Sequence, residues 1–196
     1  MKLSQPYLIQ RIIDAIGGMQ TSNVKATPAE YKQILHKDLD GPARKQNWNY
    51  RSVVGMLNYL VSCTRPGLLY SVHQCARFSV NPMLSHEQAV KRICRYLLGT
   101  KEQGLIMTPD ISAGIDCFVD ADFAGNWLKE DAEDRNSLLS RTGFVIFFCG
   151  CPITWVSKLQ TEVALSTTEA EYIALSHSMR ELIPFRSLGL EFQERL

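Results

Sequence analysis

Apolar residues recur with helical spacing through much of the first half of the chain. From Pro6 they fall three or four positions apart until Gly17-Gly18 stops the pattern, which predicts a short amphipathic helix. The same spacing returns between residues 50 and 100, where Thr64-Arg65-Pro66 and Asn81-Pro82 divide it into three predicted helices. The first half is therefore expected to be helical.

The predicted helices of this half are joined by a polar stretch. Residues 20–49 are interrupted by proline and glycine, so we expect an extended linker that packs along a surface. The last helix is expected to begin at Ser85, because Ser85-His86-Glu87-Gln88 fits a capping box, and to end near Gly99. His86 has no partner in the sequence and is expected to be a structural or surface residue.

In the second half the pattern changes to the alternation of strands. Residues 115–120 place apolar side chains on one face and Asp116, Phe118 and Asp120 on the other. A polar loop is expected at 126–142. Further strands are expected at 143–148, 153–156 and 163–165, with turns at 149–152 and 157–160. Together they predict an antiparallel meander.

The acidic end of the first of these strands is the main candidate for chemistry. Asp120 ends the alternating run, and Asp122 follows just before the turn implied by Gly125. Carboxylates at a strand end are well placed to bind Mg²⁺, which prefers oxygen ligands in a partly open site. The alternative is a solvated strand end with surface acids.

A final helix is expected to begin at a second capping box, Ser166-Thr167-Thr168-Glu169. The capping role explains Glu169. Glu171 shares a stripe with Ala174 and Ser178, so its carboxylate is expected on the face that packs on the sheet. A buried carboxylate is costly without a cation, which a metal shared with Asp120 would supply. A salt bridge to a buried Arg or Lys is the alternative.

Composition adds that the chain can form a core. It has 196 residues, 45% of them hydrophobic and 21% charged, with no apolar stretch near the roughly 20 residues that cross a bilayer. The start of the chain lacks an apolar signal core, so we expect an intracellular protein without membrane contact. The six cysteines form no C-x-x-C pair, and we expect reduced thiols rather than a disulfide or a zinc site.

Charge divides the chain in two. Residues 1–109 carry 14 Lys and Arg against 6 Asp and Glu, whereas residues 110–196 carry 7 against 14. The basic part is suited to a polyanion and the acidic part to metal, unless the two modules simply attract each other. Candidate phosphate contacts, or alternatively members of an ordinary solvated helix face, are Arg65, Arg77, Lys91, Arg92 and Arg95.

Several linked motifs then carry a family resemblance. In order they are Val119-Asp120-Ala121-Asp122-Phe123-Ala124-Gly125, Ser140-Arg141-Thr142-Gly143, Pro152-Ile153-Thr154-Trp155-Val156-Ser157-Lys158 and Ala164-Leu165-Ser166-Thr167-Thr168-Glu169-Ala170-Glu171-Tyr172. They resemble the ribonuclease H domain of copia-type retrotransposon Pol polyproteins. Upstream, Tyr50-Arg51-Ser52-Val53-Val54-Gly55, Thr64-Arg65-Pro66 and Lys91-Arg92-Ile93-Cys94-Arg95 are similar to the thumb and connection region of the reverse transcriptase.

The resemblance implies a fold and a chemistry. It implies an α/β (α+β) protein with a helical thumb and connection region at 1–109. A truncated ribonuclease H-like fold, an antiparallel three-stranded meander plus the first helix, follows at 110–196. In the family, two Mg²⁺ ions cleave the RNA strand of an RNA–DNA hybrid. Asp120 and Glu171 match the first two acidic ligands; the role of Asp122 stays open. The implied partners are RNA–DNA hybrid or other nucleic acid and the rest of the Pol polyprotein, in the cytoplasm, the nucleus or virus-like particles.

Two departures from the family pattern lower the expected activity. No Asp-Asp pair of a polymerase palm occurs, so polymerase activity is not expected. The family's third and later acids are expected after residue 196, together with a strand that would pair with the first. We therefore expect an exposed strand edge, a domain that is marginally stable alone, and little or no hydrolysis. A nucleic-acid-binding or structural remnant is the alternative, as is a partner chain that supplies the remaining acids.

Overall fold

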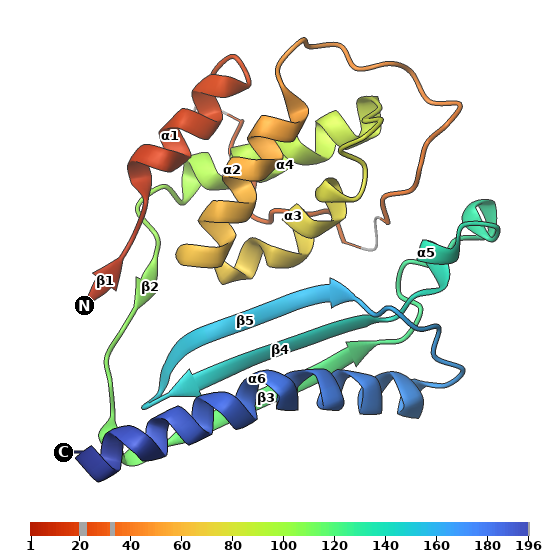
Figure 1. Cartoon of the computed structure of the whole chain (residues 1–196). Helices are drawn as coiled ribbons and strands as arrows, with labels where there is room; N and C mark the ends of the chain where they lie inside the picture. Colours follow the sequence, from red (N-terminus) through yellow and green to blue (C-terminus); the bar gives the residue numbers. More distant parts are fainter. Residues whose placement is uncertain (20–22, 32–33, 196) are drawn as a thin grey trace. The chain divides into compact units, whose positions relative to one another are not determined.

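The computed structural model describes residues 1–19, 23–31 and 34–195, with the side chains of residues 130 and 192–195 left out (Figure 1). The chain forms two compact units, Met1–Ile106 and Met107–Leu196. Helices and two small antiparallel sheets make up these units, which confirms the mixed α/β class. The predicted thumb, connection and ribonuclease H identities of the two parts stay predictions.

The first unit is a bundle of helices. It contains α1 (Pro6–Ala15), α2 (Tyr50–Cys63), η2 (Pro66–Leu68), α3 (Leu69–Ala76) and α4 (Leu84–Gly99), with the short strands β1 (Lys2–Leu3) and β2 (Leu105–Ile106) paired antiparallel. Each helix predicted from apolar spacing is present, and Pro66 opens the first turn after α2 as expected. The apolar stripes meet in one core that includes Ile12, Leu57, Leu60 and Ile93.

The start of α4 differs from the prediction. The helix begins at Leu84 rather than at Ser85, and Ser85 does not cap it. The Ser85 hydroxyl instead donates a hydrogen bond of 2.5 Å to the Asp38 carboxylate. The backbone N–H of Met83 is satisfied by Nδ1 of His86 at 2.8 Å. The local cap is thus made by Met83 and His86, while Ser85 contacts a residue 47 positions away in sequence.

The second unit is an antiparallel sheet covered by one long helix. The strands β3 (Ile115–Asp122), β4 (Arg141–Phe148) and β5 (Cys151–Leu159) lie in the order β3-β4-β5, and α6 (Thr167–Arg195) packs on β3 and β4 (Figure 1). Short helical turns η3 (Ile111–Ala113), η4 (Lys129–Asp131) and α5 (Arg135–Leu138) lie outside the sheet. Among the described residues β3 pairs only with β4, so it forms an edge of the sheet.

The meander is confirmed in part. The turn between β4 and β5 consists of Cys149 and Gly150, with φ angles of 51° and 73°, a backbone suited to a two-residue hairpin. The predicted turn at 157–160 is wrong, because Ser157 and Lys158 pair with β4 and extend β5. The predicted strand at 163–165 is also wrong: these residues form the loop that leads into α6. The sheet still has three strands, because β3, which precedes β4 in the chain, pairs with it.

The faces of β3 follow the predicted alternation. Ile115 and Cys117 lie toward α6, since Cys117 hydrogen-bonds Ser178, and the Ile115 side chain lies beside Gly189. Asp116, Phe118 and Asp120 are exposed on the opposite face. The buried hydrophobic residues described in this unit are Leu139, Phe144, Ile146, Cys151, Ala164, Ala170 and Ala174.

The six cysteines are free thiols. Cys75 and Cys94 are buried, and burial raises the pKa of each to about 12.

Among the described helices none is both long enough and apolar enough to cross a membrane.

Candidate functional site

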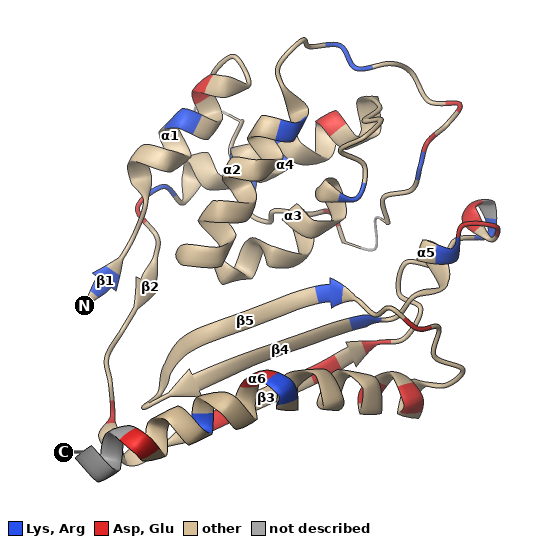
Figure 2. Cartoon of the chain, in the orientation of Figure 1, with Lys and Arg blue, Asp and Glu red and all other residues tan. Residues whose placement is uncertain are grey.

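The acidic end of β3 carries Asp120, the predicted metal ligand of the sheet. Asp120 lies opposite Gly143 and Asp122 opposite Arg141 in the ladder with β4, and both acids are exposed. The strand extends through Asp122, one pleat further than the alternation indicated. The C-terminal end of β3 and the first turns of α6 lie at the same end of this unit, and both carry acidic residues (Figure 2).

The chain turns sharply after this acidic end. Ala124 has a φ of 49°, and its N–H donates to the Ser140 hydroxyl at 3.2 Å. The Asp122 carboxylate lies against Gly125 so closely that a Cβ atom at Gly125 would overlap it. A larger residue at position 125 would therefore require the exposed Asp122 side chain to move, and the turn marks the end of the strand.

Glu171 does not occupy the buried position that the sequence predicted. Its side chain is exposed, whereas Ala170, Ala174 and Ser178 face the sheet and are fully buried. The buried line of α6 therefore has a period of four and starts at Ala170. Glu171 is one residue further on, about 100° around the helix. The burial argument for a cation at Glu171 is thus wrong, and Glu171 remains a candidate only through the resemblance.

The described residues do not fit a complete site for two metal ions. No group of three or more His, Cys, Asp or Glu side chains gathers in this part of the chain. Asp120 and Glu171 are exposed carboxylates of the type that Mg²⁺ binds. Two such groups would leave most ligand positions of a metal pair to water or to other protein groups.

Arg65 and Arg77, two of the predicted phosphate contacts, have structural roles. Arg65 is only 7% exposed and donates to the backbone oxygen and the hydroxyl of Thr100 at 2.8 and 2.7 Å. This bond ties the end of α4 to the loop after α2. Arg77 donates to Gln74 at 2.8 Å and stacks on Phe78. Arg65 is thus largely removed from solvent and Arg77 is half-buried, and a phosphate contact of either residue stays a prediction.

Lys91 is also committed to protein contacts. Its Nζ donates to the Glu87 carboxylate at 2.5 Å, and Glu87 is completely buried. Burial is the largest single influence on the pKa of Glu87 and raises it. Lys91, the Gln46 N–H and Arg44 together lower this pKa by more, so that it lies below the ordinary value. Glu87 therefore stays ionised and holds the linker against α4.

Arg92 and Arg95, on the same helix, differ from each other. Arg92 pairs with Glu30 at 2.5 Å and donates to Thr27 at 3.0 Å. Arg95 is half-buried and lines a cavity of about 380 Å³, which Lys25 and Lys45 of the linker also line. These two lysines were not predicted as phosphate contacts, because residues 20–49 fit a linker by their polar composition. Their signal was that the linker is itself basic.

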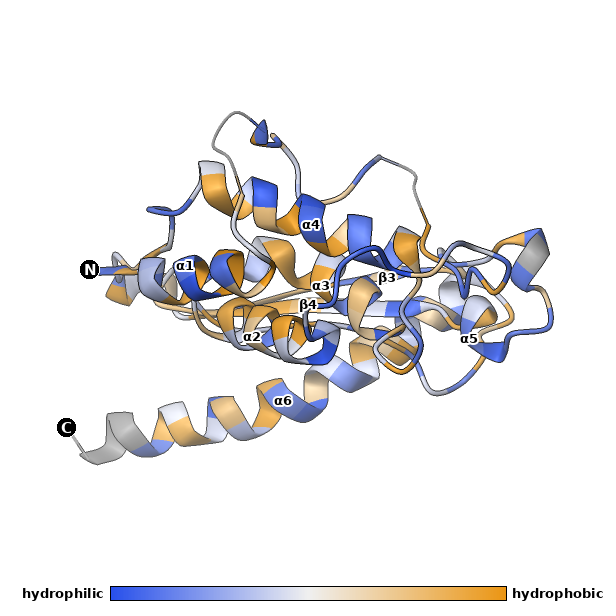
Figure 3. Cartoon of the chain, turned by 90° about the horizontal axis from the view of Figure 1, so that it is seen from above, coloured by the Kyte–Doolittle hydropathy of each residue, from blue (hydrophilic) through white to orange (hydrophobic). Residues whose placement is uncertain are grey.

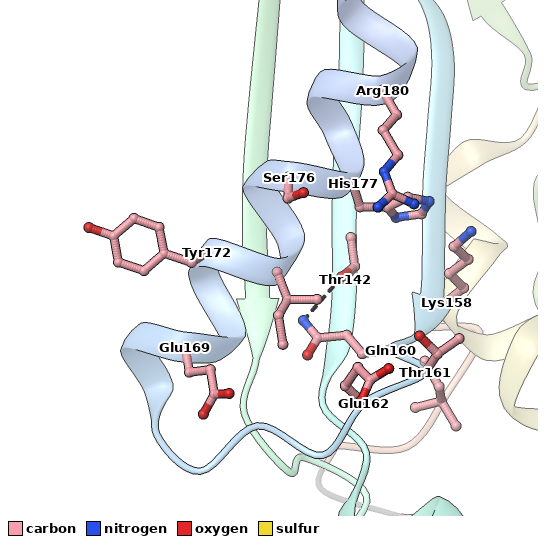
Figure 4. Close-up of a pocket in the computed structure, with 12 residues that line it drawn as sticks. Thr142, Lys158, Gln160, Thr161, Glu162, Glu169, Tyr172, Ser176, His177 and Arg180 are labelled. Atoms are coloured by element: carbon pink, nitrogen blue, oxygen red, sulfur yellow. Dashed lines mark hydrogen bonds between the residues drawn. The ribbon is translucent and has the colours of Figure 1, made fainter.

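A second cavity, of about 490 Å³, lies between β5 and α6 in the second unit (Figure 4). Lys158 enters it from the strand, and His177 and Arg180 enter it from the helix. Gln160 is buried in its wall and donates to the Thr142 hydroxyl and the Ala170 carbonyl at 3.2 and 2.9 Å. The sequence analysis assigned none of these residues a function.

His86 has the structural role that the sequence allowed. It is completely buried and stacks on Phe78, with ring centroids 4.2 Å apart. Because its Nδ1 accepts from Met83, its Nε2 donates to the carbonyl of His36 at 2.7 Å. Burial is the main cause that lowers the pKa of His86, and the ring is held neutral.

Comparison with known proteins gives a consistent set of relatives. The chain is 38% identical over 98% of its length to "Retrovirus-related Pol polyprotein from transposon TNT 1-94" of Nicotiana tabacum. It is 36% identical over 75% of its length to the corresponding polyprotein from transposon RE1 of Arabidopsis thaliana. The chain spans 14% and 9% of these two relatives.

A shorter relative is matched over nearly the whole of its own length. "Secreted RxLR effector protein 161" of Plasmopara viticola is 39% identical over 70% of the chain, a match that covers 92% of that protein. No family model matches the chain, and no solved structure matches it.

Proposed function

Since the chain belongs to the family of retrovirus-related Pol polyproteins from copia-type transposons, we propose that its second unit is the N-terminal part of a ribonuclease H-like domain. The observation that supports this proposal is the arrangement of β3 and α6. The strand ends in Asp120 and Asp122 at the end of the unit where α6 begins, and Glu171 is in the first turns of that helix. An antiparallel meander followed by a helix is the order that the resemblance implies.

The proposed substrate class is RNA paired with DNA. In the family two Mg²⁺ ions supply the metal chemistry, and Asp120 and Glu171 would be two of their ligands. Because the described residues offer no third ligand nearby, we assign hydrolysis to the family and expect little or none from this chain by itself. The acids present here would bind metal weakly.

The first unit would contribute backbone contacts. Lys25 and Lys45 line one cavity beside α4 together with Arg95, a residue of the predicted basic face. Contacts of this kind neutralise phosphates without reading sequence. This cluster also favours the second candidate function, a nucleic-acid-binding module without catalysis.

The nuclease proposal is tested with the whole chain and a labelled RNA–DNA hybrid in Mg²⁺. We expect Mg²⁺ to shift the NMR resonances of Asp120 and Glu171, and Asp120→Asn and Glu171→Gln to abolish these shifts. Asp116→Asn is the matched control, because Asp116 is exposed on the same face of β3. Cleavage is expected to be close to the background without protein.

Three outcomes separate the candidates. Strong cleavage by the unmodified chain that Asp120→Asn abolishes would contradict the expected inactivity but support the site. Metal shifts that survive both acid substitutions would reject the site. Salt-dependent binding of the hybrid that is unchanged in the double acid variant, with no metal effect, would favour the binding module instead.

A further inference from the structure

The cavity between β5 and α6 brings two cations and a histidine together in an acidic part of the chain. Residues 110–196 carry 7 Lys and Arg against 14 Asp and Glu. Two of those seven, Lys158 and Arg180, line this one cavity together with His177 (Figure 4). Figure 4 shows the His177 and Arg180 side chains projecting from α6 toward the side of β5 that carries Lys158.

Neither cation is neutralised within the described residues. Every ion pair among those residues involves Glu87 or Glu30 of the first unit, so Lys158 and Arg180 have no acidic partner at ion-pair distance. Glu162 and Glu169 also line the cavity, but Figure 4 shows both at its other end from Arg180, and the Glu169 carboxylate accepts the Leu165 N–H at 2.7 Å. The positive groups thus remain available to an external anion.

The electrostatics at His177 support their proximity. Burial is the largest cause that lowers the pKa of His177, and the charges of Lys158 and Arg180 lower it further. Glu181 on the same helix acts in the opposite direction but does not reverse the shift. His177 is therefore a neutral hydrogen-bonding group between two cations.

Contacts within the protein hold the walls of the cavity in place. Gln160 joins β5 to β4 through the Thr142 hydroxyl and to α6 through the Ala170 carbonyl. The His177 ring packs edge-on against Phe144, with centroids 5.6 Å apart. A cavity of about 490 Å³ is large enough for a small polar ligand, since ligand pockets span roughly 300–1,000 Å³.

We propose that this cavity binds a phosphate group of a nucleic-acid strand, with Lys158 and Arg180 as charged donors and His177 as a further hydrogen-bonding group. An Arg guanidinium and a Lys ammonium are the usual phosphate ligands in proteins. The inference rests on the proposed function for the identity of the strand. It adds a second point of contact beside β5, at the opposite edge of the sheet from β3.

The test uses the whole chain and fluorescence anisotropy of a labelled RNA–DNA hybrid over a range of salt concentrations. The double variant Lys158→Gln/Arg180→Gln is expected to bind about tenfold more weakly at low salt. The slope of log K against log salt is expected to become shallower by about 0.9 for each lost phosphate contact. The matched control is Lys129→Gln/Arg186→Gln, which removes the same charge from exposed positions of the same unit outside this cavity.

A second titration uses inorganic phosphate and follows NMR resonances of residues 158, 177 and 180. Shifts that the Lys158→Gln/Arg180→Gln variant loses support the site, and Lys158→Arg/Arg180→Lys is expected to retain binding. Equal weakening in the cavity variant and the control would overturn the proposal, since general charge would then explain the binding. Normal hybrid affinity in the cavity variant would also overturn it.

The two proposals fail separately. If the chain binds no hybrid but inorganic phosphate still shifts the three cavity residues, the phosphate site stands and the nuclease-related function falls. If the hybrid binds but phosphate shifts none of the three and the cavity variant has normal affinity, this inference falls and the proposed function stands.

Discussion

The two units of the chain differ in the side chains that form their cores and in the contacts that their charged residues make. The first buries large aliphatic side chains from four helices, among them Ile12, Leu57, Leu60 and Ile93. The core of the second relies on Phe144 and Ile146 together with small residues of α6. Figure 3 shows hydrophobic and hydrophilic residues mixed along the visible side of α6, and Leu175 and Ile183 are about half exposed.

The charges follow the same division. In the first unit Glu87, Lys91, Arg92 and Arg65 are used in contacts that hold the linker and the helices together. In the second unit four exposed charged residues take part in no ion pair among the described residues: Asp120, Glu171, Lys158 and Arg180. The described ion pairs thus stabilise the first unit, whereas these four charged residues of the second unit remain exposed to solvent.

The largest expected effect comes from the core of the first unit. Leu60→Ala removes a fully buried side chain and is expected to lower the free energy of unfolding of this unit by about 2–5 kcal/mol. Urea unfolding should show this through the fluorescence of Trp48, which is in the same core, while Trp155 of β5 reports on the second unit.

The same experiment tests whether the units are independent. The second unit, with its thinner core and open strand edge, is expected to unfold at lower urea concentration than the unmodified first unit. Tyr59→Ala, at an exposed position beside Leu60 on α2, is the control and should shift neither transition by more than about 0.5 kcal/mol. A single transition that shifts as a whole with Leu60→Ala would contradict the division.

Local periodicity was sufficient to predict most of the secondary structure. The apolar stripes predicted α1, α2, α3 and α4, because a helix that buries one face must repeat its apolar residues every three or four positions. The alternation in 115–120 likewise predicted both faces of β3. The strand at 163–165 was wrong because three apolar residues fit a loop as well as a strand.

The candidate site was harder to predict because its features depend on contacts distant in sequence. Arg65 looked like a free cation, but Thr100, 35 residues later, binds it. Glu171 was predicted to be buried because it was placed on the same stripe as Ala174. The buried stripe instead begins one residue earlier, at Ala170, where small side chains let α6 pack against the sheet. The grouping of Lys158 with Arg180 requires β5 and α6 to pack together, which no local pattern reveals.

A smaller effect is expected in the second unit from Gln160, the buried amide that joins three elements. Gln160→Leu keeps the approximate volume but leaves the Ala170 carbonyl and the Thr142 hydroxyl without this donor. We expect a loss of about 1–3 kcal/mol, typical of buried polar groups left unsatisfied. The loss should appear in the Trp155 transition and not in the Trp48 transition.

Thr161→Ala serves as the control for Gln160, because Thr161 is the next residue and its side chain is exposed. Its stability should equal that of the unmodified chain. If Gln160→Leu were equally stable, the amide would not hold β5 to α6, and the phosphate cavity would lose the rigidity of its wall.

The smallest expected effect is a pH dependence of the first unit, carried by His86. The pKa of this ring is lowered in the folded chain, chiefly by burial, from an ordinary value of 6.5. The unfolded chain therefore binds the proton more readily than the folded one, and stability falls as pH drops below about 6.5. Protonation of Nδ1 would also remove its bond to the Met83 N–H.

Urea unfolding followed by Trp48 at pH 7.5, 6.5 and 5.5 should show this loss, and His86→Gln should flatten the profile over the same interval. Glu87 does not account for it, because a lowered carboxylate pKa removes stability only at more acidic pH. His177 also has a lowered pKa, but its half-exposed ring should give the second unit a shallower slope. Equal slopes in the Trp48 and Trp155 transitions would show that burial of the imidazole does not distinguish the two units, because a half-exposed ring would then resist protonation as strongly as a fully buried one.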